Sequence, residues 1–340
     1  MSKTKKHFGI KHYNFAIAAT VAIFGGAVFF NGFAALLPLT ALVLIEIVFS
    51  FENAVINSQV LSTMRRVWRI IFLTVGIFFA VFVVRAVLPL VLVSSSTDST
   101  VIEVWNLALH HPEEYALRLE SAYPVIAAFG GVFLLMVGLR FFGEKRKVRW
   151  LDGLEAPLGE FNQPWWVSIV GAIIATSAIY TILAPGDAKV ALAGAFGAVA
   201  FLTIKLISKL LIGHETKKTH GSHRHGFTQL MYLELLDASF SFDSVIAAFA
   251  ITKNVILITA GLGIGAVFVR SMTLHLLDNG TLRHYRYLVH GAHYAILVLS
   301  LMLLVGIRYH IPEVVAGVAG ILILLLAFHS SRRYNVLYGI

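Results

Sequence analysis

Long apolar stretches alternate with short polar segments along the whole chain. About 20 residues of helix are needed to cross the hydrocarbon core of a bilayer, and ten stretches approach or exceed that length. We therefore predict an all-α, polytopic transmembrane helical bundle of about ten spans. The expected spans are residues 14–32, 34–60, 70–93, 123–142, 166–184, 187–212, 228–251, 254–274, 287–306 and 313–330.

The composition supports a membrane environment. Of 340 residues, 58% are hydrophobic and only 13% are charged, whereas a soluble protein carries roughly 25% charged residues. The apolar excess must face a lipid bilayer, which excludes a disordered chain and a conventional soluble enzyme. The net charge of +9 is explained by basic cytoplasmic loops, so we expect no nucleic-acid partner. Cysteine is absent, which excludes thiolate metal ligands.

Loop charges predict the orientation. With ten spans, the basic clusters fall on one side of the membrane, and the long loop at 94–122, which is mainly acidic, falls on the other. The positive-inside rule then places both termini in the cytoplasm, and we expect the protein in a bacterial inner (plasma) membrane. The basic clusters are residues 3–11, 65–69, 145–149, 217–224, 283–286 and 332–333.

The chain contains an internal repeat. Residues 46–53 (EIVFSFEN) align without a gap with residues 237–244 (DASFSFDS), and two further pairs of segments match in the same order. We expect two repeats of five helices, 1–185 and 186–340, forming one integrated membrane domain with helices 2–4 and 7–9 as its core. An odd number of helices inverts the second copy, an architecture found in many secondary transporters. The further pairs are 79–85 with 265–270 and 135–141 with 303–309.

The aligned segments place acids inside apolar helices, where each carboxylate costs about 2.5–3.5 kcal/mol. Helical spacing puts several polar residues of each copy on one stripe. Glu52 and Asp243 each follow an aligned acid by six residues, about 120° away from that stripe. Either they face another helix, or the chain unwinds at 50–51 and 241–242. The stripes are Glu46, Ser50, Asn53 and Asn57 in the first copy, and Glu234, Asp237, Ser241 and Ser244 in the second.

Several carboxylates in a low-dielectric cavity cannot all remain ionised without a cation. Carboxylate, amide and hydroxyl oxygens favour hard divalent ions such as Mn²⁺, Mg²⁺ or Ca²⁺. The alternative is a polar network that only joins helices.

At these residues the chain resembles the TerC-type (tellurium resistance C) integral membrane proteins, in particular a branch of unknown function. Residues 237–244 fit the second motif of that family, and residues 46–53 fit the first, except that Glu52 replaces the usual aspartate. The resemblance implies transport of a divalent metal, chiefly Mn²⁺ efflux, with links to metal homeostasis and tellurite resistance. The candidate metal ligands are Glu46, Glu52, Asn53, Asp237, Asp243 and Ser244, with Ser50 and Ser241 lining or unwinding the helices.

Arginines and histidines add candidates of other kinds. Arg85 and Arg270 lie at mirrored depths and are either counter-charges for the acids or snorkelling side chains. A histidine-rich loop either collects metal or lies on anionic lipid. His290 and His293 are either proton carriers or, more simply, helix-interface hydrogen bonders. The histidines of the loop are His214, His220, His223 and His225.

These features predict a secondary transporter of a divalent cation, with Mn²⁺ first, working by alternating access. We expect no enzyme activity and no tightly bound cofactor, the transported cation being the substrate. Two alternatives remain: a metal-binding scaffold that recruits soluble partners through residues 144–165 and 213–227, and an intramembrane hydrolase with paired carboxylates. Possible partners beyond lipid and metal are a second copy of the chain and cytosolic stress proteins.

Overall fold

A computed structural model describes residues 12–97, 99–144, 148–160, 164–212, 223–309 and 311–338. Helices make up nearly all of this part of the chain, and it contains no strand. Eight helices are long and apolar enough to cross a bilayer, and a ninth span is formed if one bent pair of helices is counted as a unit. The prediction of an all-α polytopic membrane protein is confirmed.

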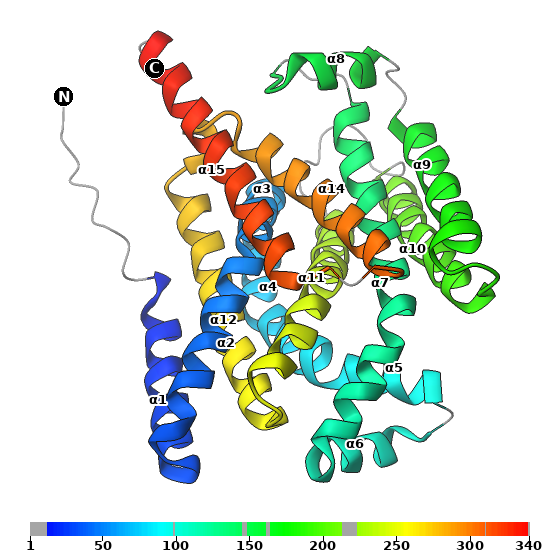
Figure 1. The fold of residues 1–340 in the computed structure, drawn as a ribbon. Helices are drawn as coiled ribbons and strands as arrows, with labels where there is room; N and C mark the ends of the chain where they lie inside the picture. The colour runs from blue at the N-terminus through cyan, green and yellow to red at the C-terminus, as the bar shows by residue number, and fades with distance from the viewer. Residues whose placement is uncertain are drawn as a thin grey trace, which may run out of the picture.

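The helices follow one another with short connections, as Figure 1 shows. Two segments within them, η3 and η4, are π-helical, and η2 is a 3₁₀ turn. In chain order the elements are α1 (Asn14–Asn31), η2 (Phe33–Ala35), α2 (Leu36–Phe49), α3 (Phe51–Thr63), α4 (Arg66–Phe78), η3 (Phe79–Val87), α5 (Leu88–Thr97), α6 (Val101–His110), α7 (Pro112–Gly143), α8 (Asp152–Glu160), α9 (Pro164–Ala178), η4 (Ile179–Leu183), α10 (Ala188–Ile212), α11 (His223–Ile251), α12 (Val255–Asp278), α13 (Thr281–His284), α14 (Leu288–Gly306) and α15 (Glu313–Tyr338).

The number of spans differs from the predicted ten. The bent pair is α2 with α3, which together cover the second expected span. The expected span at 228–251 lies within α11, a helix of 29 residues that is absent from the eight. Its sequence carries Glu234, Asp237 and Asp243, and three carboxylates make a helix too polar to qualify by composition.

The acidic segment at 94–122 is helical, so the prediction of a long loop there is wrong. Thr100 and Glu103 form a capping box that begins α6, because each side chain satisfies a backbone N–H of the first turn. Pro112 occupies the first turn of α7, where its missing N–H costs nothing. At 1.5 Å per residue, the 32 residues of α7 extend about 48 Å, so α7 is longer than one membrane crossing requires.

The two halves of the chain pack into each other rather than side by side. The long helix α7 contacts α9 within its own half and α10 and α14 from the second half. The helix α12 lies against α2, α3 and η3, and α11 lies against α4 and η3. Figure 1 shows α12 beside α2 and α1, and α14 crossing α7. This interpenetration brings both acidic motifs into the interior.

Large apolar side chains cover much of the outer surface. Phe29 and Phe30 of α1 and Leu37 of α2 are each more than 80% exposed. A helix that is apolar on its outer face as well as its inner face is stable only where lipid replaces water. These outer faces are therefore the lipid-contacting surface of the bundle.

Candidate functional site

The first acidic motif lies at a bend between two helices. α2 and α3 meet at an angle of 51°, with Ser50 (φ −108°, ψ 14°) between them. The Ser50 hydroxyl donates a hydrogen bond to Glu46 Oε1 at 2.9 Å. The second motif lies in α11, which continues as helix through residues 241–242. Of the two alternatives, unwinding is therefore found at 50–51 in the first copy and is not found at 241–242 in the second.

Glu46 is completely buried and forms an ion pair with Arg85. The pair lies beneath α12, which approaches closely because residue 265 is glycine. A Cβ at Gly265 would overlap the side chain of Glu46 and lie 3.2 Å from the Val43 carbonyl oxygen. The small residue thus brings α12 over the carboxylate and excludes lipid from it.

Arg85 is held by the π-helix η3. Its Nη2 pairs with Glu46, and its Nη1 donates to the Ala80 carbonyl at 2.8 Å. The side chain is buried, so it does not extend to the headgroups. π-helical turns widen a helix and occur frequently at functional sites. Of the two interpretations of Arg85, the structure supports the counter-charge.

The second motif has an arginine of its own. Arg270 Nη2 lies 3.4 Å from Glu234 Oε1 and 3.5 Å from Asp237 Oδ2. The same guanidinium donates to the carbonyl oxygens of Phe72 (2.6 Å) and Gly76 (3.0 Å) on α4. A Cβ at Gly76 would overlap Glu234 Oε1. Glycine is therefore needed at this position of α4, where the Glu234 carboxylate and the Arg270 guanidinium contact the helix. Arg270 is also a counter-charge.

The two copies therefore make equivalent ion pairs. Glu46 aligns with Asp237, and Arg85 aligns with Arg270. In each copy the aligned acid pairs with the aligned arginine. Arg85 is also close enough to Glu234 for an electrostatic interaction, so the two pairs belong to one charged cluster. The division into repeats at 185–186 and the inversion of the second copy stay predictions.

Glu52 faces away from this cluster, as its angular offset from the stripe predicts. It is buried against α15, where a Cβ at Gly320 would lie 3.4 Å from Glu52 Oε2. No arginine or lysine among the described residues forms a salt bridge with it. Glu52 is thus a buried acid without a counter-charge in this part of the chain.

The remaining predicted ligands are only partly placed. Asn53 is buried beside the bend, and Ser244 is buried in α11. The side chains of Ser241 and Asp243 lie outside the described residues, as do His214, His220 and the side chains of His223 and His225. The backbone of His223 and His225 belongs to the start of α11, so the predicted loop does not include these two residues.

Unsatisfied oxygens are the main chemical feature of the site. One oxygen each of Glu46, Glu52 and Glu234 is buried and has no hydrogen-bond partner among the described side chains. Burying a carboxylate oxygen without a partner is costly. The described residues contain no group of three or more His, Asp or Glu arranged to hold a metal ion. The geometry therefore shows one cluster of three acids and two arginines, with Glu52 as a separate buried acid, and it does not show an assembled metal centre.

Glu155 is a further buried carboxylate, and no sequence motif marks it. Glu155 of α8 accepts hydrogen bonds from the backbone N–H of Trp150 and from the Tyr294 hydroxyl (3.2 Å). His290 Nε2 lies 3.6 Å from Glu155 and 2.9 Å from the Val148 carbonyl oxygen. This network attaches the segment before α8 to α14. A lone acid in a short polar helix such as α8 has no periodic signal, so the sequence could not single it out.

The two histidines of α14 make contacts at helix interfaces. His293 Nδ1 bonds to the Val289 carbonyl (2.8 Å), and its ring stacks on Phe141 with centroids 3.5 Å apart. The contacts of His290 and His293 agree with the simpler interpretation of both residues, and their role as proton carriers stays untested.

Comparison with known proteins identifies a family. The model of the family described as "Protein of unknown function (DUF475)" matches residues 51–337. The chain belongs to this family. No curated protein and no solved structure matches the chain.

Membership of the DUF475 family corrects the predicted resemblance to the TerC-type proteins. The matching family is DUF475, and no TerC family matches, so the TerC assignment is wrong. Acids and serines at helical spacing are what any buried polar site in a membrane helix needs, and they do not identify a family. The DUF475 match includes Glu52, Arg85, Asp237 and Arg270 and begins after Glu46.

Proposed function

We propose that this DUF475 protein is a secondary membrane transporter of a hard divalent cation, with Mn²⁺ as the first ion to test. The cation would move by alternating access through the acidic motifs of α2–α3 and α11. One observation carries the proposal: three buried carboxylates, Glu46, Glu52 and Glu234, each keep an oxygen without a partner within the described residues. Such oxygens are unused acceptors for a cation.

The charge of the motifs supports a divalent substrate. The described motif acids are four carboxylates. Two arginines face three of them, and Glu52 has no arginine partner among the described residues. If all are ionised, the excess of two negative charges equals the charge of one divalent cation. The available ligand atoms are oxygens, which suit Mn²⁺, Mg²⁺ and Ca²⁺. The four acids are Glu46, Glu52, Glu234 and Asp237.

The arginines supply a reason for reversible binding. Arg85 neutralises Glu46 in this structure, so it compensates the carboxylate whenever no cation is bound. An arriving cation would compete with the guanidinium for Glu46, which weakens binding enough to permit release. The bend at Ser50 is where α2 and α3 would change their angle, because a single residue separates the two helices.

The orientation follows from the loop charges. We place both termini in the cytoplasm and the protein in a bacterial inner membrane, with efflux as the direction to test. Arg65, Arg66 and Arg69 around the start of α4 would then face the cytoplasm.

Metal uptake by reconstituted vesicles tests the proposal. The full chain is placed in liposomes, and influx of Mn²⁺, Mg²⁺, Ca²⁺ and Zn²⁺ is measured separately with an internal indicator. We expect saturable transport of at least one hard divalent ion and its loss in Glu52→Gln, a variant that preserves shape and removes one charge. Glu46→Gln should also lose transport. Glu120→Gln changes an exposed acid of α7 and serves as the matched control with unchanged flux.

Two results would contradict the proposal. One is the absence of flux of any of the four ions in vesicles that contain correctly folded protein. The other is wild-type flux in both Glu52→Gln and Glu46→Gln, because the proposed cation path requires these carboxylates.

A further inference from the structure

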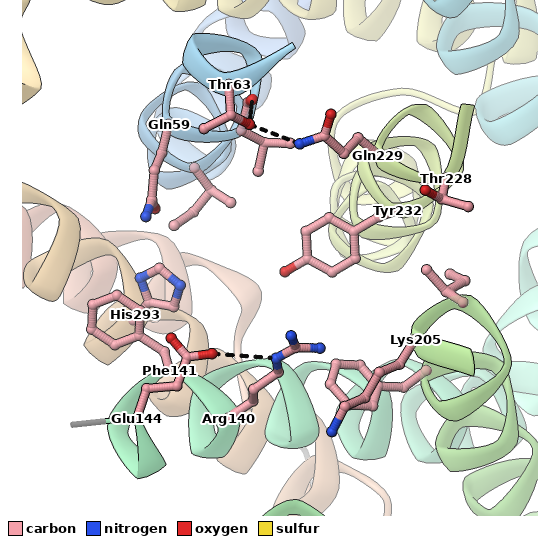
Figure 2. A pocket seen from close by; sticks show the side chains of 14 residues that line it. Gln59, Thr63, Arg140, Phe141, Glu144, Lys205, Thr228, Gln229, Tyr232 and His293 are labelled. Atoms are coloured by element: carbon pink, nitrogen blue, oxygen red, sulfur yellow. Dashed lines mark hydrogen bonds and ion pairs between the residues drawn. The ribbon is translucent and has the colours of Figure 1, made fainter. Parts of the chain in front are cut away.

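A polar pocket separate from the acidic motifs lies among five helices. Its volume is about 300 Å³, and its walls come from α3, α7, α10, α11 and α14. Figure 2 shows Gln59 and Thr63 of α3 on one side and Arg140 and Lys205 on the other, with the Tyr232 ring between them. A cavity of this size holds a small polar group.

The charge of the lining favours an anion. Among the described lining residues, Arg140 and Lys205 contribute two positive charges, and Glu144 contributes one negative charge. Glu144 lies 3.6 Å from Arg140 Nε, and both side chains are 41% exposed, so this pair is only partly shielded from solvent. A net positive lining repels a divalent cation, which distinguishes the pocket from the proposed transport site.

Hydrogen-bonding groups surround these charges. Gln229 Nε2 donates to Thr63 Oγ1 at 2.7 Å across the pocket, as Figure 2 shows. The hydroxyl of Tyr232 lies within electrostatic reach of both Arg140 and Glu144. Arginine recognises the oxygens of phosphate in a two-point geometry, and lysine adds a point charge.

The position of the pocket suits a membrane–water boundary. Arg140 lies in the last turn of α7, and Thr63 is the last residue of α3. The chain continues from α3 directly into the basic residues Arg65 and Arg66. Apolar side chains share the lining with the charged ones, among them Ile56, Phe201 and Ile204. Basic pockets between transmembrane helices bind phosphate-bearing headgroups in this setting.

We infer that this pocket binds a phosphate group between Arg140 and Lys205, with Tyr232 and Gln229 as neighbouring hydrogen-bonding groups. The phosphate could belong to the headgroup of an anionic phospholipid or to a soluble phosphate ester, because both present the same chemistry to the two cations. The inference is independent of the transport proposal.

Ligand titration of the detergent-purified full chain tests the inference. The probes are dioleoyl phosphatidic acid, dioleoylglycerol (the same lipid without phosphate), glycerol 3-phosphate and inorganic phosphate. Binding is followed by native mass spectrometry and by the shift in thermal unfolding. We expect phosphate-bearing probes to bind and dioleoylglycerol not to bind. The double variant Arg140→Gln/Lys205→Gln should lower affinity at least about tenfold, as expected for losing charge-assisted hydrogen bonds.

A matched double variant serves as the control. Arg118→Gln/Lys189→Gln removes the same two charges from the same two helices, and Arg118 also pairs with a glutamate four residues away. This control should bind like the wild type. The charge-preserving variant Arg140→Lys/Lys205→Arg should retain most binding, which separates loss of charge from loss of structure.

The outcome also identifies the source of the phosphate. Binding of phosphatidic acid alone assigns a lipid headgroup, and binding of glycerol 3-phosphate or inorganic phosphate assigns a soluble ligand. The inference is overturned if dioleoylglycerol binds as well as phosphatidic acid and the soluble phosphates do not bind. It is equally overturned if the pocket variant and its control lose affinity to the same extent.

Discussion

Removing one partner of the Glu46–Arg85 pair should destabilise the fold strongly, and removing both should not. Glu46→Gln leaves the Arg85 guanidinium buried beside a neutral amide, with the Ala80 carbonyl as its other acceptor. Arg85→Met leaves the carboxylate of Glu46 with the Ser50 hydroxyl as its described hydrogen-bond donor. Each change leaves an uncompensated buried charge, which costs about 3–5 kcal/mol.

The double variant Glu46→Gln/Arg85→Met removes both charges from the interior. Replacing a whole buried ion pair by uncharged groups of similar volume is often nearly neutral. We therefore expect the double variant to be more stable than either single variant, with a coupling energy of at least about 3 kcal/mol. The free energy of unfolding is measured for all four proteins by titrating mixed detergent micelles with sodium dodecyl sulfate and following helix content.

An exposed pair on α7 provides the comparison. Arg118 and Glu114 are four residues apart and partly exposed to solvent. The same cycle at these positions should give a coupling energy of only about 0.3–0.5 kcal/mol. One result would refute the assignment of Arg85 as the counter-charge of Glu46. In that result each single variant of the buried pair costs less than about 1 kcal/mol, and the two effects add up in the double variant.

Three further predictions concern packing and local structure. The first two are measured as changes in the free energy of unfolding, and the third is measured by hydrogen exchange. Gly265→Ala should cost about 1–3 kcal/mol, because the added Cβ overlaps the side chain of Glu46. Gly25→Ala is the control and should be neutral or stabilising, because its added Cβ has no neighbour within 4 Å. Equal costs for the two variants would exclude close packing of α12. Asn254→Ala should cost about 1 kcal/mol, because Asn254 caps two backbone N–H groups of α12, and an unchanged stability would contradict this cap. Glu155→Gln should weaken the attachment of the segment before α8, and hydrogen exchange at residues 148–155 should become faster. Unchanged exchange would show that the Glu155 carboxylate does not hold this segment against α14.

The membrane class of the protein was predictable from local sequence. Apolar stretches of about 20 residues are long enough to cross a bilayer as helices, and a helix satisfies all the backbone hydrogen bonds of such a stretch within itself. The same reasoning does not extend to residues 94–122, because the charge of a segment does not distinguish a polar helix from a loop. Its capping box at Thr100 and the proline at position 112 are local signals of helix starts, and they outweighed the acidic composition.

The candidate site was predictable in its acids and not in their partners. The repeat alignment paired Glu46 with Asp237 and Arg85 with Arg270, but it left open whether each arginine faced a carboxylate or the headgroups. Spacing also left two explanations for Glu52. The structure combines both of them, since the chain bends at Ser50 and Glu52 faces α15.

Sequence alone determined that the chain is a helical membrane protein with acids in its interior, since these properties depend on composition and on periodicity within single helices. Only the tertiary structure decided which charges meet, because ion pairs such as Arg270 with Glu234 join residues on different helices. Their contact depends on how closely α4, α11 and α12 approach. That approach is set by glycines whose effect appears only when a neighbouring helix is in place, so no pattern along one helix could reveal it.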